Sequence, residues 1–350
     1  MNAQQAVELD PQNAHRVSDY LYEHGWSDGL PVLPATEAHV DEFLAQTSRS
    51  HDEVIAKLPQ LKRTATVREV AVHAVMAGCR PDYFPVVLAT WDALTNERAA
   101  LGGGWQSTSG PAPWVIVNGP IREQLGINST GGVYGPGFRP NMTIPRAVGL
   151  TVRNSFGLLP HELEQATQGV PGRWSQLIGE DEEHSPWEPL SVELGAAAGE
   201  SRVSTMLVRT CEFLDNRHFH EPVEILRDFA DTISRSGPWI FRHSSVGIVM
   251  NPDHARVLAT AGYSKQDVRE WLVEHCGKTE QQLKSVGKGL GAKQPDGPFD
   301  DEHFHRVFAE NSPKALPIVV AGSPNAAISM VVRVFSDWSA ASFPVENSGA

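Results

Sequence analysis

Cysteine is scarce in this sequence, which excludes two common ways of stabilising a fold. The three cysteines in 350 residues, Cys79, Cys211 and Cys276, are far apart, and no Cys-x-x-Cys pair occurs. A disulfide scaffold or a structural zinc site therefore does not fit the sequence. We expect a protein of the reducing cytoplasm.

Basic residues and long apolar runs are also few. Lys and Arg number 29 against 42 Asp and Glu, a net charge of −13, which argues against nucleic acid and anionic membranes as partners, although solubility alone would explain it. No apolar run approaches the roughly 20 residues of a membrane-spanning helix. The first 13 residues lack the basic segment and apolar core of a signal peptide. The expected ligand is a small molecule, and a homo-oligomer is left open.

The apolar runs that are present are short and alternate with helical patterns, which is typical of an α/β fold. Three of them, at 114–120, 246–252 and 318–324, share one design of apolar residues, turn residues and a proline. Each pattern predicts a buried strand followed by a turn. Ligands bind at such corners, although ordinary connections have the same pattern. We expect a parallel or mixed sheet with helices on both faces.

The chain is long enough for two subdomains. We expect an N-terminal α/β region at 1–195, which holds the binding loop, and a C-terminal α/β region at 196–350. No long internal repeat is evident, and the Gly- and Pro-rich residues 285–300 are expected to form a mobile loop. Helices are predicted at 13–24, 36–46, 66–78, 85–100, 222–235, 253–261 and 264–276, and further strands at 174–179 and 203–210.

The segment 126–154 is the strongest candidate for a binding site. A loop rich in Gly and Asn, with Gly135 and Gly137, leads into a helical pattern. Glycine lets the backbone approach a ligand, and a helix start offers free N–H groups to an anion. Beside this turn, Arg139 would clamp a carboxylate or phosphate, and Asn128 and Asn141 would hydrogen-bond the same ligand.

Two further arginines continue the pattern along the predicted helix. Arg146 and Arg153 are seven residues apart, about two helical turns, and so share one face. They would add positive charge to the site, or else pair with surface acids. The loop is neither a Walker loop nor a dinucleotide fingerprint, because the defining spacings are missing.

Cys79 is a candidate thiol at the end of a predicted helix. The neighbouring Arg80 would lower its pKa, whereas a helix C-terminus would raise it. The alternative is a buried small hydrophobe.

An acidic run at 180–188 is a candidate for acid–base chemistry. Clustered carboxylates such as Glu182 and Glu188 raise one another's pKa or hold a divalent cation, and His184 is their best titrating partner. A solvated turn is the alternative, but Trp187 favours a packed one. Asp28, in the turn 25–31, is either a catalytic carboxylate or a structural turn residue.

Two His-Phe-His triplets, at 218–220 and 303–305, are candidate metal ligands. In a strand both histidines of a triplet point the same way, whereas in a helix they diverge. The second triplet lies in a predicted helix, which counts against metal. The alternative is that these are surface histidines.

Several long strings resemble a bacterial family whose members are often encoded beside small proteins with a selenocysteine- or cysteine-Gly-Ser-Cys (UGSC) motif. The resemblance spans most of residues 15–325. It implies a thiol or selenol protein as partner, but it assigns no reaction. The strings are GWSDGLPVLPAT, AGCRPDYFPVVLA, VIVNGPIREQLGIN, GPGFRPNMTIPRAVGLTVRN, QGVPGRW, EDEEHSPWEPL and HARVLATAGYSKQDVREWL.

The resemblance also marks positions that match the family. At 322–327 the chain departs from it, because the Gly/His/Ser turn that follows the last strand in other members lacks its histidine here. Any role of that histidine is absent from this chain. The matching positions are Asp28, Cys79, Arg80, Asn128, Gly135, Gly137, Arg139, Asn141, Arg146, Arg153, Asn154, Glu182 and Glu188.

These patterns together predict an enzyme that binds a small polar, anionic substrate and cleaves or rearranges it by acid–base chemistry, with thiol assistance. The class could be lyase, hydrolase or thiol-linked reductase, and no cofactor is identified. One alternative is a non-catalytic subunit that presents substrate to a thiol or selenol partner, and another is a metal-dependent hydrolase or lyase. The candidate catalytic residues are Cys79, Glu182, Glu188 and Asp28, and the other matching positions are candidates for substrate binding.

Overall fold

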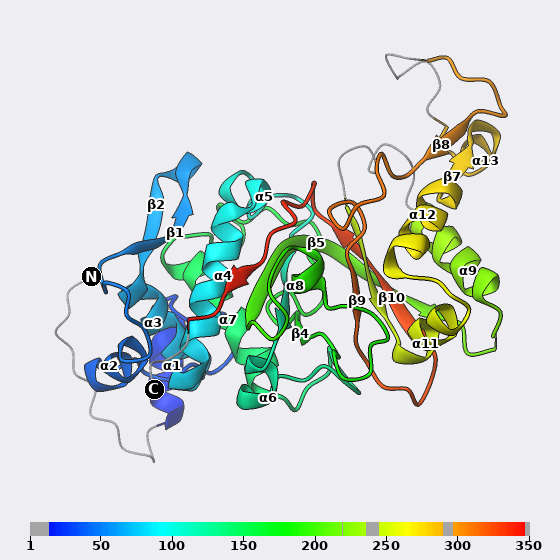
Figure 1. The fold of residues 1–350 in the computed structure, drawn as a ribbon. Coiled ribbons are helices and arrows are strands. Elements are labelled where there is room, and N and C mark those ends of the chain that lie inside the picture. The colour runs from blue at the N-terminus through cyan, green and yellow to red at the C-terminus, as the bar shows by residue number, and fades with distance from the viewer. Residues whose placement is uncertain (1–13, 219, 236–244, 290–296, 347–350) are drawn as a thin grey trace.

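The computed structural model describes residues 14–218, 220–235, 245–289 and 297–346 (Figure 1). A seven-stranded mixed sheet with helices packed around it forms the centre of the molecule. The prediction of an α/β fold with a mixed sheet is confirmed. Within the described ranges, every helix falls short of the length and apolar character needed to span a bilayer.

The pattern of parallel and antiparallel strand pairings is the same from either edge of this sheet. The order is β4-β3-β5-β10-β6-β9, with β11 paired to β5. The edge pairs β3/β4 and β6/β9 are parallel, and the three central pairings are antiparallel. The strands are β3 (Ala112–Asn118), β4 (Leu177–Gly179), β5 (Arg202–Asp215), β6 (Val246–Met250), β9 (Ile318–Val320), β10 (Ile328–Val334) and β11 (Phe343–Pro344).

The sheet therefore consists of two halves with one topology. In each half a strand is followed by a parallel neighbour and then by an antiparallel strand at the centre: β3, β4, β5 in one and β6, β9, β10 in the other. The first strands of the two halves, β3 and β6, are those predicted at 114–120 and 246–252, whose sequences share one design. The repeated topology also shows that the predicted regions 1–195 and 196–350 both contribute strands to one sheet.

The sheet is curled (Figure 1), and its two edges meet at one point. The amide of Asp181, after β4, donates to the carbonyl of Val320 in β9 at 2.7 Å. The amide of Gly322, after β9, donates to Ser129 O at 2.9 Å. The carboxyl ends of β4 and β9, which belong to different halves, are thereby joined; we call this place the edge junction.

Alternate residues of the strands fill two sides of the curled sheet. On the outer side, Val115 and Val117 of β3 pack with one helical group; Ile248 of β6 packs with another. On the inner side, Trp114 and Ile116 share a core with both halves. This period of two is what a strand buried on both faces requires.

The first helical group covers the half built on β3. It comprises α1 (Ala14–Glu23), α2 (Glu37–Leu44), α3 (Val67–Ala77), α4 (Phe84–Asn96) and α7 (Arg139–Asn154), beside a hairpin of β1 (Val54–Leu58) and β2 (Arg63–Thr66). The predicted capping box of Thr66 and Glu69 starts α3, and Gly78 ends it with φ +84°. The predicted single helix at 85–100 is divided at Glu97, where α5 (Arg98–Leu101) begins.

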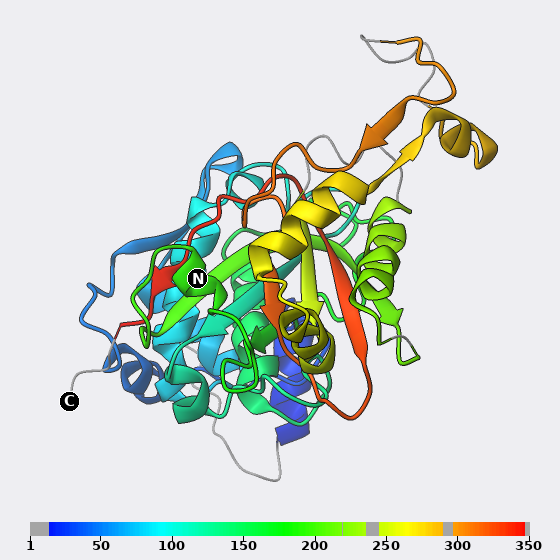
Figure 2. The same ribbon diagram turned by 45° about the vertical axis from the view of Figure 1, so that its right-hand side comes forward.

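The second helical group covers the half built on β6. It comprises α9 (Pro222–Ser234), α11 (Pro252–Thr260) and α12 (Lys265–His275), close to their predicted ranges. A hairpin of β7 (Gly277–Thr279) and β8 (Phe304–Arg306), with α13 (Glu280–Ser285), projects from the body (Figures 1 and 2). The prediction of a helix over the 303–305 triplet is therefore wrong. Residues 290–296 of the expected mobile loop lie outside the described residues.

Candidate functional site

Polar side chains gather where the edge strands end. Asn118 is the last residue of β3, and Asn251 follows β6, the equivalent strand of the other half. The amide of Asn118 donates to Glu180 after β4, and that of Asn251 donates to Ser323 O after β9, at 2.8 and 2.7 Å. In both halves an asparagine thus ties the end of one strand to the segment that follows its parallel neighbour.

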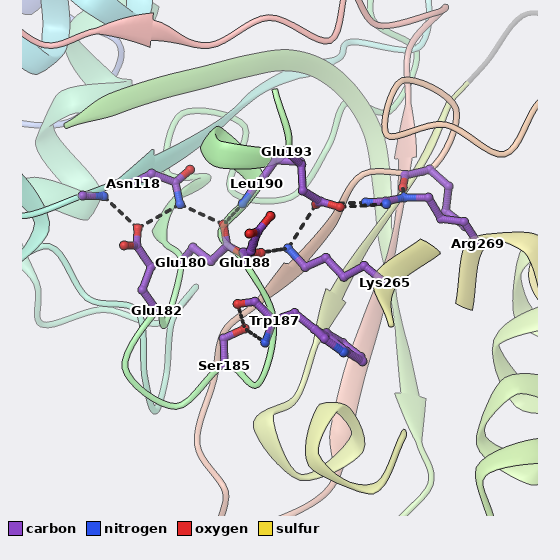
Figure 3. A network of polar contacts seen from close by, with 12 residues as sticks. Asn118, Glu180, Glu182, Ser185, Trp187, Glu188, Leu190, Glu193, Lys265 and Arg269 are labelled. Carbon is purple, nitrogen blue, oxygen red and sulfur yellow. Dashed lines mark hydrogen bonds and ion pairs between the residues drawn. The ribbon is translucent and has the colours of Figure 1, made fainter. Parts of the chain in front are cut away.

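Glu180 is the centre of a buried polar network (Figure 3). Its side chain is fully withdrawn from solvent. One carboxylate oxygen accepts from Asn118 Nδ2 and from the amide of Leu190, both at 2.8 Å. The other lies 3.2 Å from Lys265 Nζ, on α12. A buried carboxylate is stable only when it is satisfied in this way.

The network continues from Lys265 into the second half (Figure 3). Lys265 Nζ also donates to Glu188 O at 2.7 Å and lies 3.2 Å from Glu193. Glu193, in α8 (Leu190–Glu193), accepts both terminal nitrogens of Arg269 at 2.8 and 3.0 Å. Because every charge is paired inside the protein, the network joins the segment after β4 to α12, and its role is structural.

Of the two predicted carboxylates in the acidic run, only Glu182 makes side-chain contacts here. Its Oε1 accepts from Asn118 Nδ2 at 3.0 Å and from Gly119 N at 2.7 Å, and Arg122 Nε lies 3.4 Å away. Glu188 contributes its carbonyl to Lys265, and its side chain is exposed. The turn between them is packed, as Trp187 predicted, because the indole N–H donates to Tyr263 O at 3.0 Å.

At the edge junction, Asp181 and His184 form a dyad. His184 Nδ1 lies 2.9 and 3.1 Å from the two carboxylate oxygens of Asp181. The Asp181 side chain is 2% exposed, whereas the imidazole is 67% exposed. A carboxylate only accepts hydrogen bonds, so Nδ1 is the donor in this contact, which in the neutral form of the ring leaves the lone pair on Nε2. That arrangement suits a group that accepts a proton from a ligand.

The glycine-rich loop lies against the same junction. A Cβ on Gly131 would sit 3.3 Å from the side chain of Ser323, so the loop approaches the turn after β9 closely. Gly137 has φ +113°, a conformation that favours glycine. Asn128 and Asn141 are occupied within the protein, because Asn141 exchanges hydrogen bonds with the Asn128 backbone and donates to Leu177 O. Asn141 thereby fixes the loop to β4, whereas the Asn128 side chain, which donates to Gly131 O at 3.1 Å and accepts from Thr130 N at 3.0 Å, holds the loop itself.

The three predicted arginines do not converge on the glycine turn. Arg139 donates to Gly78 O at 2.8 Å, Arg146 forms a bidentate ion pair with Asp28 at 2.8 Å for both contacts, and Arg153 donates to Gly25 O at 3.3 Å. All three hold neighbouring segments of the chain. Two further predicted positions do likewise: Asn154 donates to Trp26 O, and Arg80 pairs with Asp82.

The surroundings of Asp28 and Cys79 shift the pKa values of both side chains. Burial acts to raise the pKa of Asp28, but the hydrogen bonds and charge of Arg146 outweigh it, so this pKa lies below its ordinary value. Burial raises the pKa of the Cys79 thiol to about 12, despite a hydrogen bond with Thr143 and the charges of Arg139 and Arg146. Of the two interpretations of Cys79, the buried small residue fits the structure, and the lowering of its pKa by Arg80 does not.

Arg146 and Arg153 instead line a cavity of about 500 Å³ on the outer face of α7. We call this cavity the α7 groove. Its other walls come from Asp28 and the segment 158–175, which includes Trp174. None of its lining residues belongs to the acidic run 180–188, so Arg146 and Arg153 lie with the predicted carboxylate Asp28 and apart from Glu182 and Glu188.

The described residues contain no group of three or more His, Cys, Asp or Glu side chains that could hold a metal ion. His303 and His305 do lie side by side, with ring centroids 4.6 Å apart, but His305 Nε2 is 2.9 Å from Glu280. The triplet at 218–220 lies partly outside the described residues, because residue 219 does.

Sequence reasoning missed Asp181, Asn118, Lys265 and Arg269. The Asn-Gly-Pro turn was a usable signal for Asn118, because it follows an apolar run directly. Nothing comparable marked Lys265, since the first turn of an amphipathic helix gives no sign that a lysine there is buried.

Comparisons with protein-family models and with curated proteins found no match to this chain.

Proposed function

We propose that this chain is a small-molecule enzyme that transfers a proton at the edge junction, with His184 as the acid–base group and Asp181 as its positioning residue. The observation that carries the proposal is the dyad itself. A buried carboxylate holds one ring nitrogen at 2.9 Å while the ring stands in solvent. Such a pair fixes the tautomer of the imidazole and leaves Nε2 free to act.

The position of the dyad supports the proposal. In open α/β sheets, ligands bind beyond the carboxyl ends of the strands. The dyad stands where β4 and β9 end together, beside the glycine-rich loop. Glu182 would be a second carboxylate near the reacting group, held by Asn118 and Gly119.

The charges around His184 limit which kinds of substrate group can bind beside it. Asp181, Glu182 and Glu183 carry three negative charges here, and Arg122 is the cation that faces them, pairing with Glu183 at 2.8 Å. An anionic group beside His184 would be repelled. We therefore expect the substrate to present a neutral polar O–H, N–H or C–H acid to the imidazole, and any anionic group of the substrate to lie further away.

A conversion assay tests the proposal. The protein is incubated with a small-molecule extract, and consumed and formed compounds are followed by mass spectrometry. We expect His184→Gln to slow the wild-type conversion by about 10²–10⁴-fold, the range typical of a lost acid–base group. The matched control is His39→Gln, an exposed histidine on α2, which should leave the rate unchanged. An unimpaired His184→Gln protein, or no conversion by the wild type, would contradict the proposal.

A further inference from the structure

The α7 groove has a preformed apolar wall. Trp174 stacks on the buried Trp105 with ring centroids 5.9 Å apart and an interplanar angle of 26°. It also packs so closely on Gly149 of α7 that no Cβ fits between them. Because both neighbours hold the indole in place, the wall exists before any ligand arrives.

One face of α7 supplies the adjoining wall. Met142, Arg146, Gly149 and Arg153 line the groove at intervals of four, three and four residues along α7. This spacing places them on one side of the helix. The groove thus has an apolar floor with guanidinium groups along it.

The charges of the groove do not balance. Arg146 pairs with Asp28, and Arg173 pairs with Glu164 at 2.9 Å. Among the described residues, no carboxylate lies within ion-pair distance of Arg153. Its hydrogen bond to these residues runs from Nε to Gly25 O. Three cations against two anions leave one positive charge. A guanidinium has five N–H donors, so Arg153 keeps donors for a ligand.

We propose that the α7 groove binds a small organic anion, specifically an aromatic carboxylate. The carboxylate pairs with Arg153, and the ring lies against Trp174. A cavity of about 500 Å³ is of the size that holds a small ligand. Arginine binds a carboxylate through its planar fork, and the part of the indole that lines the cavity provides apolar contact area beside the guanidinium of Arg173, which lies over the same ring at 5.0 Å from its centroid. The proposal does not depend on the acid–base centre, which shares no residue with the groove.

Two probes on the wild-type protein test the charge requirement. Binding of 3-phenylpropionate is compared with that of its neutral amide, 3-phenylpropanamide, by isothermal titration calorimetry at low salt. We expect the acid to bind at least about ten-fold more tightly than the amide. Equal affinities, or no binding of the acid up to about 10 mM, would overturn the proposal without any variant being needed.

Two variants then test whether the anion binds in the α7 groove. Arg153→Met should weaken 3-phenylpropionate about ten-fold, whereas Arg217→Met removes the same charge at an exposed pair with Asp215 and should change nothing. Glu164→Gln removes the negative charge that faces Arg173, while its amide oxygen still accepts from Ala166 N and from Arg173, and should bind the probe several-fold more tightly. This gain cannot come from misfolding. Unchanged affinity in both groove variants would show that the anion binds elsewhere.

Discussion

The ammonium of Lys265 lies 3.2 Å from the carboxylate of Glu180, and both side chains are withdrawn from solvent. Lys265 comes from α12, which packs on the half of the sheet built on β6, whereas Glu180 follows β4 in the other half. The pair therefore spans the two halves of the molecule. Asn118 and the amide of Leu190 satisfy the rest of the carboxylate.

Replacing Lys265 with methionine should destabilise the fold strongly. The substitution leaves Glu180 charged and buried with its cation gone, a change that typically costs about 3–5 kcal/mol. The free energy of unfolding, measured by urea denaturation, checks this. Arg217→Met is the control, because Arg217 pairs with Asp215 at the surface, and this variant should lose far less stability. Equal losses in the two variants would contradict the role of the network.

Gly149→Ala should also destabilise the protein, although alanine is the better helix former. The new methyl group would sit 2.5 Å from Trp174 Cδ2. Overpacking costs about 1–3 kcal/mol, and the gain in helix propensity is at most about 1 kcal/mol. We expect a net loss in urea denaturation. The control Gly103→Ala, where nothing lies within 4 Å of the added Cβ, should keep wild-type stability.

Stability should fall between pH 6.5 and 4 because of His73. Burial in α3 lowers the pKa of His73 from 6.5 to about 4. In this window the unfolded chain binds a proton that the folded chain does not, so a lower pH stabilises the unfolded state relative to the folded state. A shift of this size corresponds to about 3 kcal/mol.

The variant His73→Met isolates this contribution. The free energy of unfolding is measured in urea at pH 7 and at pH 4. Between these two pH values it should fall by about 3 kcal/mol less in the variant than in the wild type. Parallel losses in the two proteins would mean that His73 is not held neutral by the fold.

The three thiols should be nearly inert in the native protein. Burial raises the pKa of Cys79 and of Cys211 to about 12, and it raises the pKa of Cys276 well above its ordinary value. At pH 8 only about one such thiol in ten thousand is ionised. Ellman's reagent should therefore react slowly with native protein and rapidly with three thiols after denaturation. A fast native thiol would restore Cys79 as a nucleophile; without one, thiol chemistry would need a thiol from another molecule.

The helices and strands could be predicted wherever residues close together in the sequence determine them. The capping boxes at Thr66 and Ser264 lie where they were expected, because they depend on residues three positions apart. The apolar runs at 114–120 and 246–252 do become strands. Their shared design, with an asparagine and a proline after each apolar run, was the one local sign that the two strands are equivalent, whereas the common topology of the two halves depends on pairings far apart in the sequence. The missed β10 is the central partner of β5 and β6, and such pairing depends on contacts far along the chain.

The candidate site was predictable in part. Residue type and clustering pointed to Glu182 and His184, because carboxylates beside a histidine suggest proton transfer. The arginine pattern was misleading, since Arg146 meets Asp28 across 118 positions of sequence. A guanidinium is equally suited to a ligand and to a distant carboxylate, and only the fold decides between them.

The tautomer of His184 tests the central claim most directly, and it needs no substrate. Protein labelled with ¹⁵N-histidine, observed by long-range proton–nitrogen NMR at alkaline pH, reports which nitrogen of the neutral ring carries the proton. We predict a proton on Nδ1 and a bare Nε2, and loss of that preference in Asp181→Asn, where the amide can also donate. A proton on Nε2, or the same spectrum in the Asp181→Asn variant, would contradict the dyad and the acid–base role built on it.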